Sequence, residues 1–167
     1  MKGPYKGYDI GYIYLADLEL GQLPEKIEVD GDTLLIKSEF HISLVCLKRL
    51  APMIDEQNSQ KITAEIIEAF ENFTRKHPLT NYELLKDEMR LVKRDAQKTV
   101  IVMVKVPGLD MFFDKLRQKY KVDLPTQPTH ITLYTLPPDT IGIGIVSDEM
   151  LQKQSVPIDL PELEKLL

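Results

Sequence analysis

The sequence of 167 residues has a single cysteine, Cys46, and no tryptophan. One cysteine cannot form an intramolecular disulfide or a cysteine-based zinc site, which excludes the small, disulfide-stabilised secreted class. Long hydrophobic runs are also absent, since no stretch approaches the roughly 18 to 20 apolar residues of a membrane span. The apolar stretch near the N-terminus, residues 10–16, is short and flanked by Asp9 and Asp17, unlike a signal peptide. We therefore expect a cytoplasmic protein without a membrane partner.

An excess of basic charge is missing too. Lys and Arg number 21 against 26 Asp and Glu, which gives a net charge of -5 and a pI near 5.3. This balance argues against a broad basic surface that follows a nucleic-acid backbone, so a short partner such as a nucleotide or an RNA end is expected. The hydrophobic share of 43% is average for a globular chain. We find no repeats or low-complexity segments and expect one domain over residues 1–167.

The pattern of apolar residues predicts an α+β fold. Helices are expected from Ser59 to about His77 and from Leu109 to Tyr120, where apolar residues recur at spacings of three and four, with shorter helices over 147–152 and 161–167. This order of elements favours mostly antiparallel sheets over a parallel, doubly wound sheet. Strands are expected over residues 8–15, 33–36, 40–47, 82–92, 98–106, 129–135 and 141–146.

Two of the three histidines lie in the same local context. The motifs are Phe-His-Ile-Ser-Leu, which contains His41 and Ser43, and Thr-His-Ile-Thr-Leu, which contains His130 and Thr132. Because strand side chains alternate between faces, each histidine shares a face with its hydroxyl residue. A lone strand histidine is usually a core residue, but a repeated His-x-hydroxyl pattern favours a functional pair. Each half of the chain also contains one helix, so we expect two similar lobes that share a cleft.

This pattern suits phosphoryl transfer by general acid–base catalysis. An imidazole titrates near neutral pH, so one ring can accept a proton from an attacking water while the other donates one to the leaving oxygen. The hydroxyls can hold the non-bridging oxygens of the phosphate. No metal or other cofactor is expected, because neither motif carries an acidic residue at a ligand spacing.

The paired motifs resemble the mark of the two-histidine (2H) phosphoesterase superfamily, two H-x-S/T motifs separated by about half a chain of this size. The apolar strand over 100–106, the helix over 109–120 and the Pro-Thr-His approach to the second motif also follow the usual order of the family. The resemblance implies a bilobal α+β fold, with two mostly antiparallel sheets lining a central groove and helices outside. It extends to the branch of RNA 2′,3′-cyclic phosphodiesterases and 2′-5′ RNA ligases.

Carried onto this chain, the resemblance makes His41 and His130 the catalytic pair and makes Ser43 and Thr132 the phosphate-binding residues. It does not assign the acid and the base. Ser43 stands where this branch commonly has Thr, which keeps the hydroxyl but leaves the substrate open.

The function expected from the resemblance is metal-independent hydrolysis of a cyclic phosphodiester, the 2′,3′-cyclic phosphate of a nucleotide or an RNA end. One alternative is a non-catalytic module that binds nucleotides or RNA ends in the same groove. Another is a structural or regulatory partner, suggested by the leucine-rich tail over residues 160–167.

Four further residues are candidates for substrate binding. Tyr134 is expected on the face of Thr132, where it either stacks on a base or belongs to the core. Lys37 either adds positive charge near the phosphate or is a solvated strand end. Tyr12 and Tyr14 can stack on a base, although tyrosine is common in ordinary sheets.

Three other features have structural interpretations. His77 is expected at the end of a helix, where a histidine suits the helix dipole. Cys46 is interpreted as a small buried hydrophobe. Gly142 and Gly144 begin like a dinucleotide-binding fingerprint but lack the long helix that should follow, so a bulge or a close backbone contact is expected there.

Overall fold

The computed structural model describes residues 3–138 and 140–167, and within them the chain forms two β-sheets in which every pairing is antiparallel. This confirms the expected α+β class and the antiparallel sheets. The smaller sheet has the order β1 (Tyr5–Lys6), β2 (Tyr12–Leu15), β5 (Ile42–Cys46). The larger sheet has the order β3 (Lys26–Val29), β4 (Asp32–Ile36), β8 (His130–Thr135), β7 (Gln97–Lys105), β6 (Glu83–Arg94), β9 (Ser155–Ile158).

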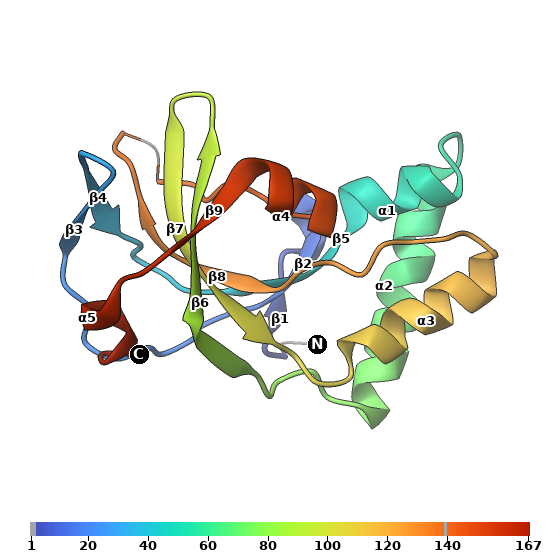
Figure 1. Cartoon of the computed structure of the whole chain (residues 1–167). Helices are drawn as coiled ribbons and strands as arrows, with labels where there is room; N and C mark the ends of the chain where they lie inside the picture. The colour runs from blue at the N-terminus through green and yellow to red at the C-terminus, as the bar shows by residue number, and fades with distance from the viewer. Residues whose placement is uncertain (1–2, 139) are drawn as a thin grey trace.

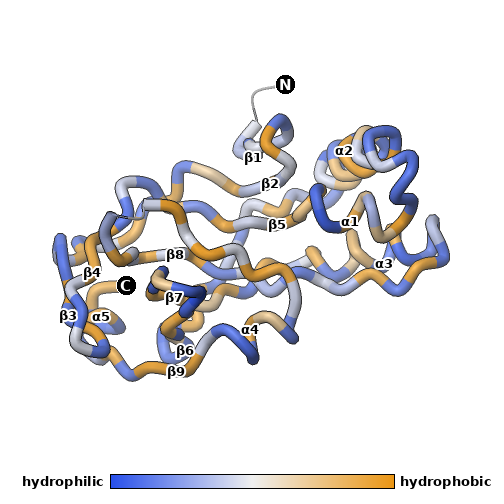
Figure 2. Tube along the Cα trace, turned by 90° about the horizontal axis from the view of Figure 1, so that it is seen from above, coloured by the Kyte–Doolittle hydropathy of each residue, from blue (hydrophilic) through white to orange (hydrophobic). Residues whose placement is uncertain are grey.

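The helices are unevenly distributed around these sheets. Helices α1 (Leu47–Ile54), α2 (Ser59–Lys76) and α3 (Leu109–Tyr120) lie together at one end of the molecule, and the short helix α5 (Pro161–Glu164) lies with β3 and β4 at the other end (Figures 1 and 2). Helix α4 (Asp148–Gln154) lies beside β6 and β9 in both views. A 3-10 helix, η1, spans Tyr8–Ile10.

One hydrophobic cluster joins both sheets to the three helices at that end. Helix α2 contributes the stripe that its spacing predicts, Ile62, Ile66, Phe70 and Phe73, all of them buried. Phe70 meets Phe112 of α3 edge to face, with ring centroids 5.3 Å apart. Burial of each such side chain stabilises the fold by about 1.5–3 kcal/mol. The stripe therefore holds together the helical end of the molecule, where α1 directly follows β5.

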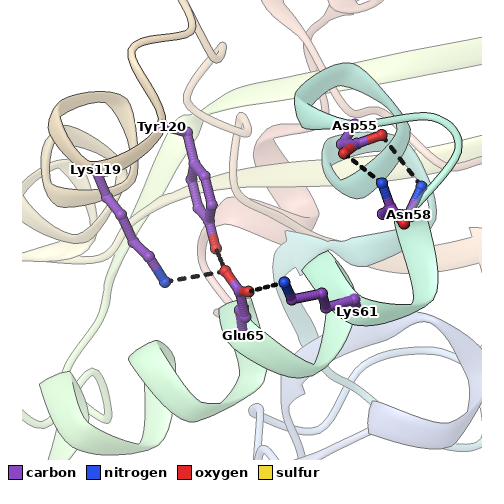
Figure 3. A network of polar contacts seen from close by, with 6 residues as sticks. All are labelled: Asp55, Asn58, Lys61, Glu65, Lys119 and Tyr120. Carbon is purple, nitrogen blue, oxygen red and sulfur yellow. Dashed lines mark hydrogen bonds and ion pairs between the residues drawn. The ribbon is translucent and has the colours of Figure 1, made fainter.

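A polar network on the surface reinforces the packing of α3 on α2. Glu65 accepts hydrogen bonds from the Tyr120 hydroxyl at 2.8 Å and from the Lys119 ammonium at 3.2 Å, and Lys61 lies 4.0 Å away (Figure 3).

In the turn before α2, both carboxylate oxygens of Asp55 accept hydrogen bonds from Asn58 (Figure 3). The helix begins at Ser59, as expected, and Asn58 is the residue that precedes its first turn.

Three of the expected strands differ in the structure. The strand expected over 8–15 is confined to β2, because Gly7 and Gly11 adopt positive φ angles of 89° and 87° and enclose η1. The strand expected over 40–47 begins at Ile42 and ends at Cys46, and α1 follows at once.

The strand expected over 141–146 was wrong, since this segment is a loop. Its apolar side chains Ile143 and Ile145 are buried against Ile101 and Met103 of β7, in a second, smaller hydrophobic cluster. The carbonyl of Gly144 accepts a hydrogen bond at 3.0 Å from the Arg94 guanidinium. Hydrophobicity therefore identified a buried segment but not its backbone pairing.

Besides η1, four short elements were not predicted from the sequence. Strand β1 has two residues, α1 contains Pro52, and β9 contains Pro157. The fourth, β3, forms an antiparallel pair with β4 through the turn at Asp30 and Gly31, both at positive φ. No helix among the described residues has the length and apolar character that a membrane crossing requires.

Candidate active site

The four motif side chains meet in one pocket of about 490 Å³, lined by His41, Ser43, His130 and Thr132. They come from different sheets, because His41 directly precedes β5 of the smaller sheet and His130 begins β8 of the larger. The segment that leads into β8 is tied to β5 by Gln127, whose Nε2 donates to the carbonyl of Ser43 at 3.3 Å. The structure thus brings together the residues that the sequence singled out as a pair of motifs.

Both motif strands carry a β-bulge at the same place. In β5, Ser43 pairs with Tyr14 and Val45 with Ile13, so Leu44 is an extra residue. In β8, Leu133 is the extra residue, between Thr132 and Tyr134. A bulge interrupts the alternation of side chains, and the residue after the bulged leucine turns into the core in both strands. In each strand the hydroxyl residue therefore faces the pocket, and the residue two positions later faces the core.

Neither pocket hydroxyl has a hydrogen-bond partner among the described residues. Thr129, by contrast, donates its hydroxyl to the carbonyl of Val104 at 2.7 Å and is buried. The backbone of Gly142 lies against Thr132, so close that a Cβ at Gly142 would lie 2.7 Å from the Thr132 Oγ1. This is the close backbone contact expected at that glycine. The Ser43 and Thr132 hydroxyls remain available to a bound group.

His130 is buried, with 8% of its surface exposed. Burial, and to a smaller degree the nearby charge of His41, lowers the pKa of His130 to about 4. The carbonyl of Pro128 opposes this by favouring the protonated ring, although Nδ1 makes no well-formed hydrogen bond. His130 is therefore a neutral imidazole at neutral pH.

His41 has a different environment at the mouth of the same pocket. Its side chain is exposed, and its ring lies against Tyr14, with centroids 4.9 Å apart and planes inclined by 49°. Loss of water around the ring and the charge of Lys37 lower the pKa of His41, while Glu39 raises it. His41 differs from His130 in its lesser burial, which leaves His41 the more readily protonated of the two rings.

Three of the four further candidates also line the pocket: Lys37, Tyr12 and Tyr14. Both tyrosines are half-buried and lie on the pocket face of β2, on either side of the buried Ile13. The ammonium of Lys37 donates to the carbonyl of Thr140 and so holds the loop 140–146 beside the pocket. Lys37 is therefore part of the pocket and not simply a solvated strand end.

Tyr134 does not lie in the pocket. It is fully buried in the main core, and its hydroxyl donates to the carbonyl of Pro24 at 2.9 Å. The expectation that it shares a face with Thr132 was wrong because the bulge at Leu133 reverses the alternation after Thr132. Burial raises the pKa of Tyr134 to about 12. Of its two sequence interpretations, the core residue is correct.

Sequence reasoning missed two parts of the pocket. Gln127 lines it, is 5% exposed, and has a buried Oε1 without a hydrogen-bond partner among the described residues. Nothing in the sequence around Gln127 distinguishes it from an ordinary loop residue. The loop 141–146 forms another wall, and its signal was the Gly-Ile-Gly-Ile sequence that was interpreted as a strand.

The sequence interpretations of His77 and Cys46 agree with the structure. His77 follows α2 as its C-cap, and its backbone N–H donates to the carbonyl of Phe73 at 2.9 Å. Cys46 is a free, buried cysteine with 5% of its surface exposed. Across residues 3–138 and 140–167, no three His, Cys, Asp or Glu side chains gather in an arrangement that could hold a metal ion.

Comparisons with protein-family models, with curated proteins and with solved structures find no match to this chain.

Proposed function

We propose that this chain is a phosphodiesterase of the two-histidine type, which hydrolyses a 2′,3′-cyclic phosphate on a nucleotide or an RNA end without a metal. The single observation that carries the proposal is the convergence of both histidines and both hydroxyls of the repeated motif on one pocket. A general acid, a general base and free hydrogen-bond donors are the groups that hydrolysis of a phosphodiester requires.

The unequal burial of the two histidines supports an assignment of their roles. His130, neutral because burial lowers its pKa to about 4, accepts the proton of the attacking water. His41, exposed at the mouth and the more readily protonated of the two rings, delivers a proton to the ribose oxygen that leaves. The water oxygen forms a bond to phosphorus, the P–O bond of the cyclic ester breaks, and the product is a phosphomonoester beside a free hydroxyl.

The hydroxyls of Ser43 and Thr132 donate hydrogen bonds to the non-bridging oxygens of the phosphate in this scheme. Their freedom from other partners among the described residues suits them to this role, because a hydroxyl already donating to a carbonyl, as in Thr129, is not available. Lys37 adds positive charge at the same pocket. Tyr12 and Tyr14 offer aromatic faces on which a base can stack.

The proposal is tested by turnover of 2′,3′-cyclic nucleotides, of an RNA oligomer that ends in a 2′,3′-cyclic phosphate, and of a 2′-5′-linked dinucleotide, all with a chelator present. We expect hydrolysis of at least one cyclic phosphate, and we expect His130→Ala to reduce it by about 10²–10⁴-fold, the usual contribution of a general acid or base. The matched control is His77→Ala, because His77 lies at the end of α2 and does not line the pocket.

Equal activity in the His130→Ala variant and the wild type would contradict the mechanism. Binding of these ligands without turnover would instead identify a non-catalytic nucleotide- or RNA-end-binding module.

A further inference from the structure

A second cavity, of about 560 Å³, adjoins the histidine pocket. The two cavities share Tyr12, residues 141–144 and Val146 as common wall. The second cavity contains neither histidine of the motifs, and we call it the basic side pocket. It is lined by Tyr12, Cys46, Lys48, Arg49, Arg94, Gln97, residues 141–144, Val146 and Met150.

Three cations and no carboxylate line the basic side pocket: Lys48, Arg49 and Arg94. None of the three forms an ion pair within the part of the chain that the structure describes. The nearby carboxylate of Glu149 is paired with Lys153 at 2.6 Å, and its pKa is lowered mainly by Lys153 and to a smaller degree by Arg49. Positive charge that forms no ion pair among the described residues is thus concentrated here, in a chain whose net charge is -5.

The contacts that these three cations make within the described chain are with neutral groups. Arg94 donates to the carbonyl of Gly144 at 3.0 Å and to Oε1 of Gln154 at 2.8 Å, both neutral groups. The Lys48 ammonium lies 5.6 Å from the centre of the Tyr12 ring. Arg49 has only a weak contact at 3.9 Å, to the sulfur of Met150. These hydrogen bonds give Arg94 a structural role, but nothing comparable accounts for Lys48 and Arg49 beside the same cavity.

We propose that the basic side pocket binds a second phosphate group of the substrate, separate from the phosphate that lies between the histidines. Guanidinium and ammonium groups bind phosphate oxygens through charge-assisted hydrogen bonds. The two cavities are adjacent and have Tyr12 in common, so in this proposal one ligand spans both, with its sugar or base beside Tyr12. The inference rests on the proposed function and makes it more specific: the substrate is a cyclic phosphodiester that carries a further phosphate.

The kinetic test compares adenosine 2′,3′-cyclic phosphate with the same compound bearing a 5′-phosphate. We expect the 5′-phosphate to raise kcat/KM of the wild type by about tenfold or more, the effect of one or two charge-assisted hydrogen bonds. Lys48→Gln and Arg49→Gln should each reduce this ratio. Lys76→Gln is the matched control, because it removes a lysine at the end of α2 that lines neither pocket. An equal ratio in all four proteins would overturn the proposal.

A binding test separates this proposal from the catalytic one. Adenosine 5′-monophosphate and adenosine are titrated calorimetrically into the His130→Ala variant, which needs no turnover. We expect the phosphate-bearing nucleotide to bind more tightly, and we expect Lys48→Gln to remove that preference in the same background. This result without any wild-type turnover would uphold the second phosphate site while the proposed hydrolysis fails. Equal affinity for adenosine and adenosine 5′-monophosphate would overturn the second site even if hydrolysis is found.

Discussion

The two motif strands of this protein have nearly the same sequence and the same bulge but very different surroundings. His130 belongs to β8, which lies inside the six-stranded sheet between β4 and β7. His41 directly precedes β5, the edge strand of a three-stranded sheet. His130 is consequently buried, and His41 is exposed. The local motif sets which side chains face the pocket, whereas the position of the strand in its sheet sets how much water each histidine retains.

The difference matters chemically because water stabilises a charged imidazole. An interior strand supplies a histidine that stays neutral, and an edge strand supplies one that holds a proton more readily. In the proposed reaction this asymmetry separates base from acid without any difference in the motif residues themselves.

The largest expected effect tests this division of roles through the leaving group. His41→Ala and His130→Ala should each reduce hydrolysis of a 2′,3′-cyclic phosphate by about 10²–10⁴-fold. With a p-nitrophenyl phosphodiester, whose leaving group needs no proton, His41→Ala should recover most of its activity and His130→Ala should not. Steady-state kinetics of both variants on both esters measures the difference. Recovery in the His130 variant instead would reverse the assignment.

The next effect concerns stability as a function of pH. The pKa of His130 is about 4 in the folded chain and near 6.5 in the unfolded chain, so the unfolded state binds a proton first. The free energy of unfolding should therefore fall as the pH falls from about 6.5 to about 4, by on the order of 3 kcal/mol from this group.

Chemical denaturation at pH 7 and pH 4.5 measures that loss. His130→Asn should make the loss smaller than in the wild type, because it removes the group that must stay neutral. His41→Asn should change it less, since His41 is the more exposed ring. An equal change in the two variants would show that burial does not lower the pKa of His130 more than that of His41.

The smallest effect tests the wall that the histidine pocket shares with the basic side pocket. Gly142→Ala would place a Cβ 2.7 Å from the Thr132 hydroxyl oxygen, so that side chain must shift, and we expect kcat/KM to fall by about tenfold or more. Gly144→Ala is the matched control, since its Cβ would meet only the Tyr12 hydroxyl at 3.9 Å. Similar activity of the two variants would argue against a role for Thr132 in binding the phosphate.

The sequence predicted those parts of the fold that depend on local pattern. The stripe of α2, the helix over 109–120 and the long strands β6 and β7 follow from the spacing of apolar residues. The pairing of His41 with Ser43, and of His130 with Thr132, follows from alternation within a strand, because each pair precedes its bulge.

What the sequence could not predict depends on contacts between distant segments. The bulge that sends Tyr134 into the core appears only when β8 pairs with β7. The first motif does indicate that this position is buried, because it has the apolar Val45 four residues after His41, where the second motif has Tyr134. The burial of His130 depends on the order of strands in the larger sheet, and Gln127 reaches the pocket only because β5 lies beside its segment.

The hydrogen bond from Gln127 to Ser43 has a consequence for the order of folding. It joins segments 84 positions apart, and the loop that forms the last wall of the pocket lies beyond residue 140. Closing such a long loop costs chain entropy that local helices do not incur, so these contacts form late. The residues of α1, α2 and α3 also precede β8 and the loop 141–146 in the chain, so they are synthesised before the pocket is complete. Under the proposed function, turnover therefore reports completion of the tertiary structure, which helix content alone does not report.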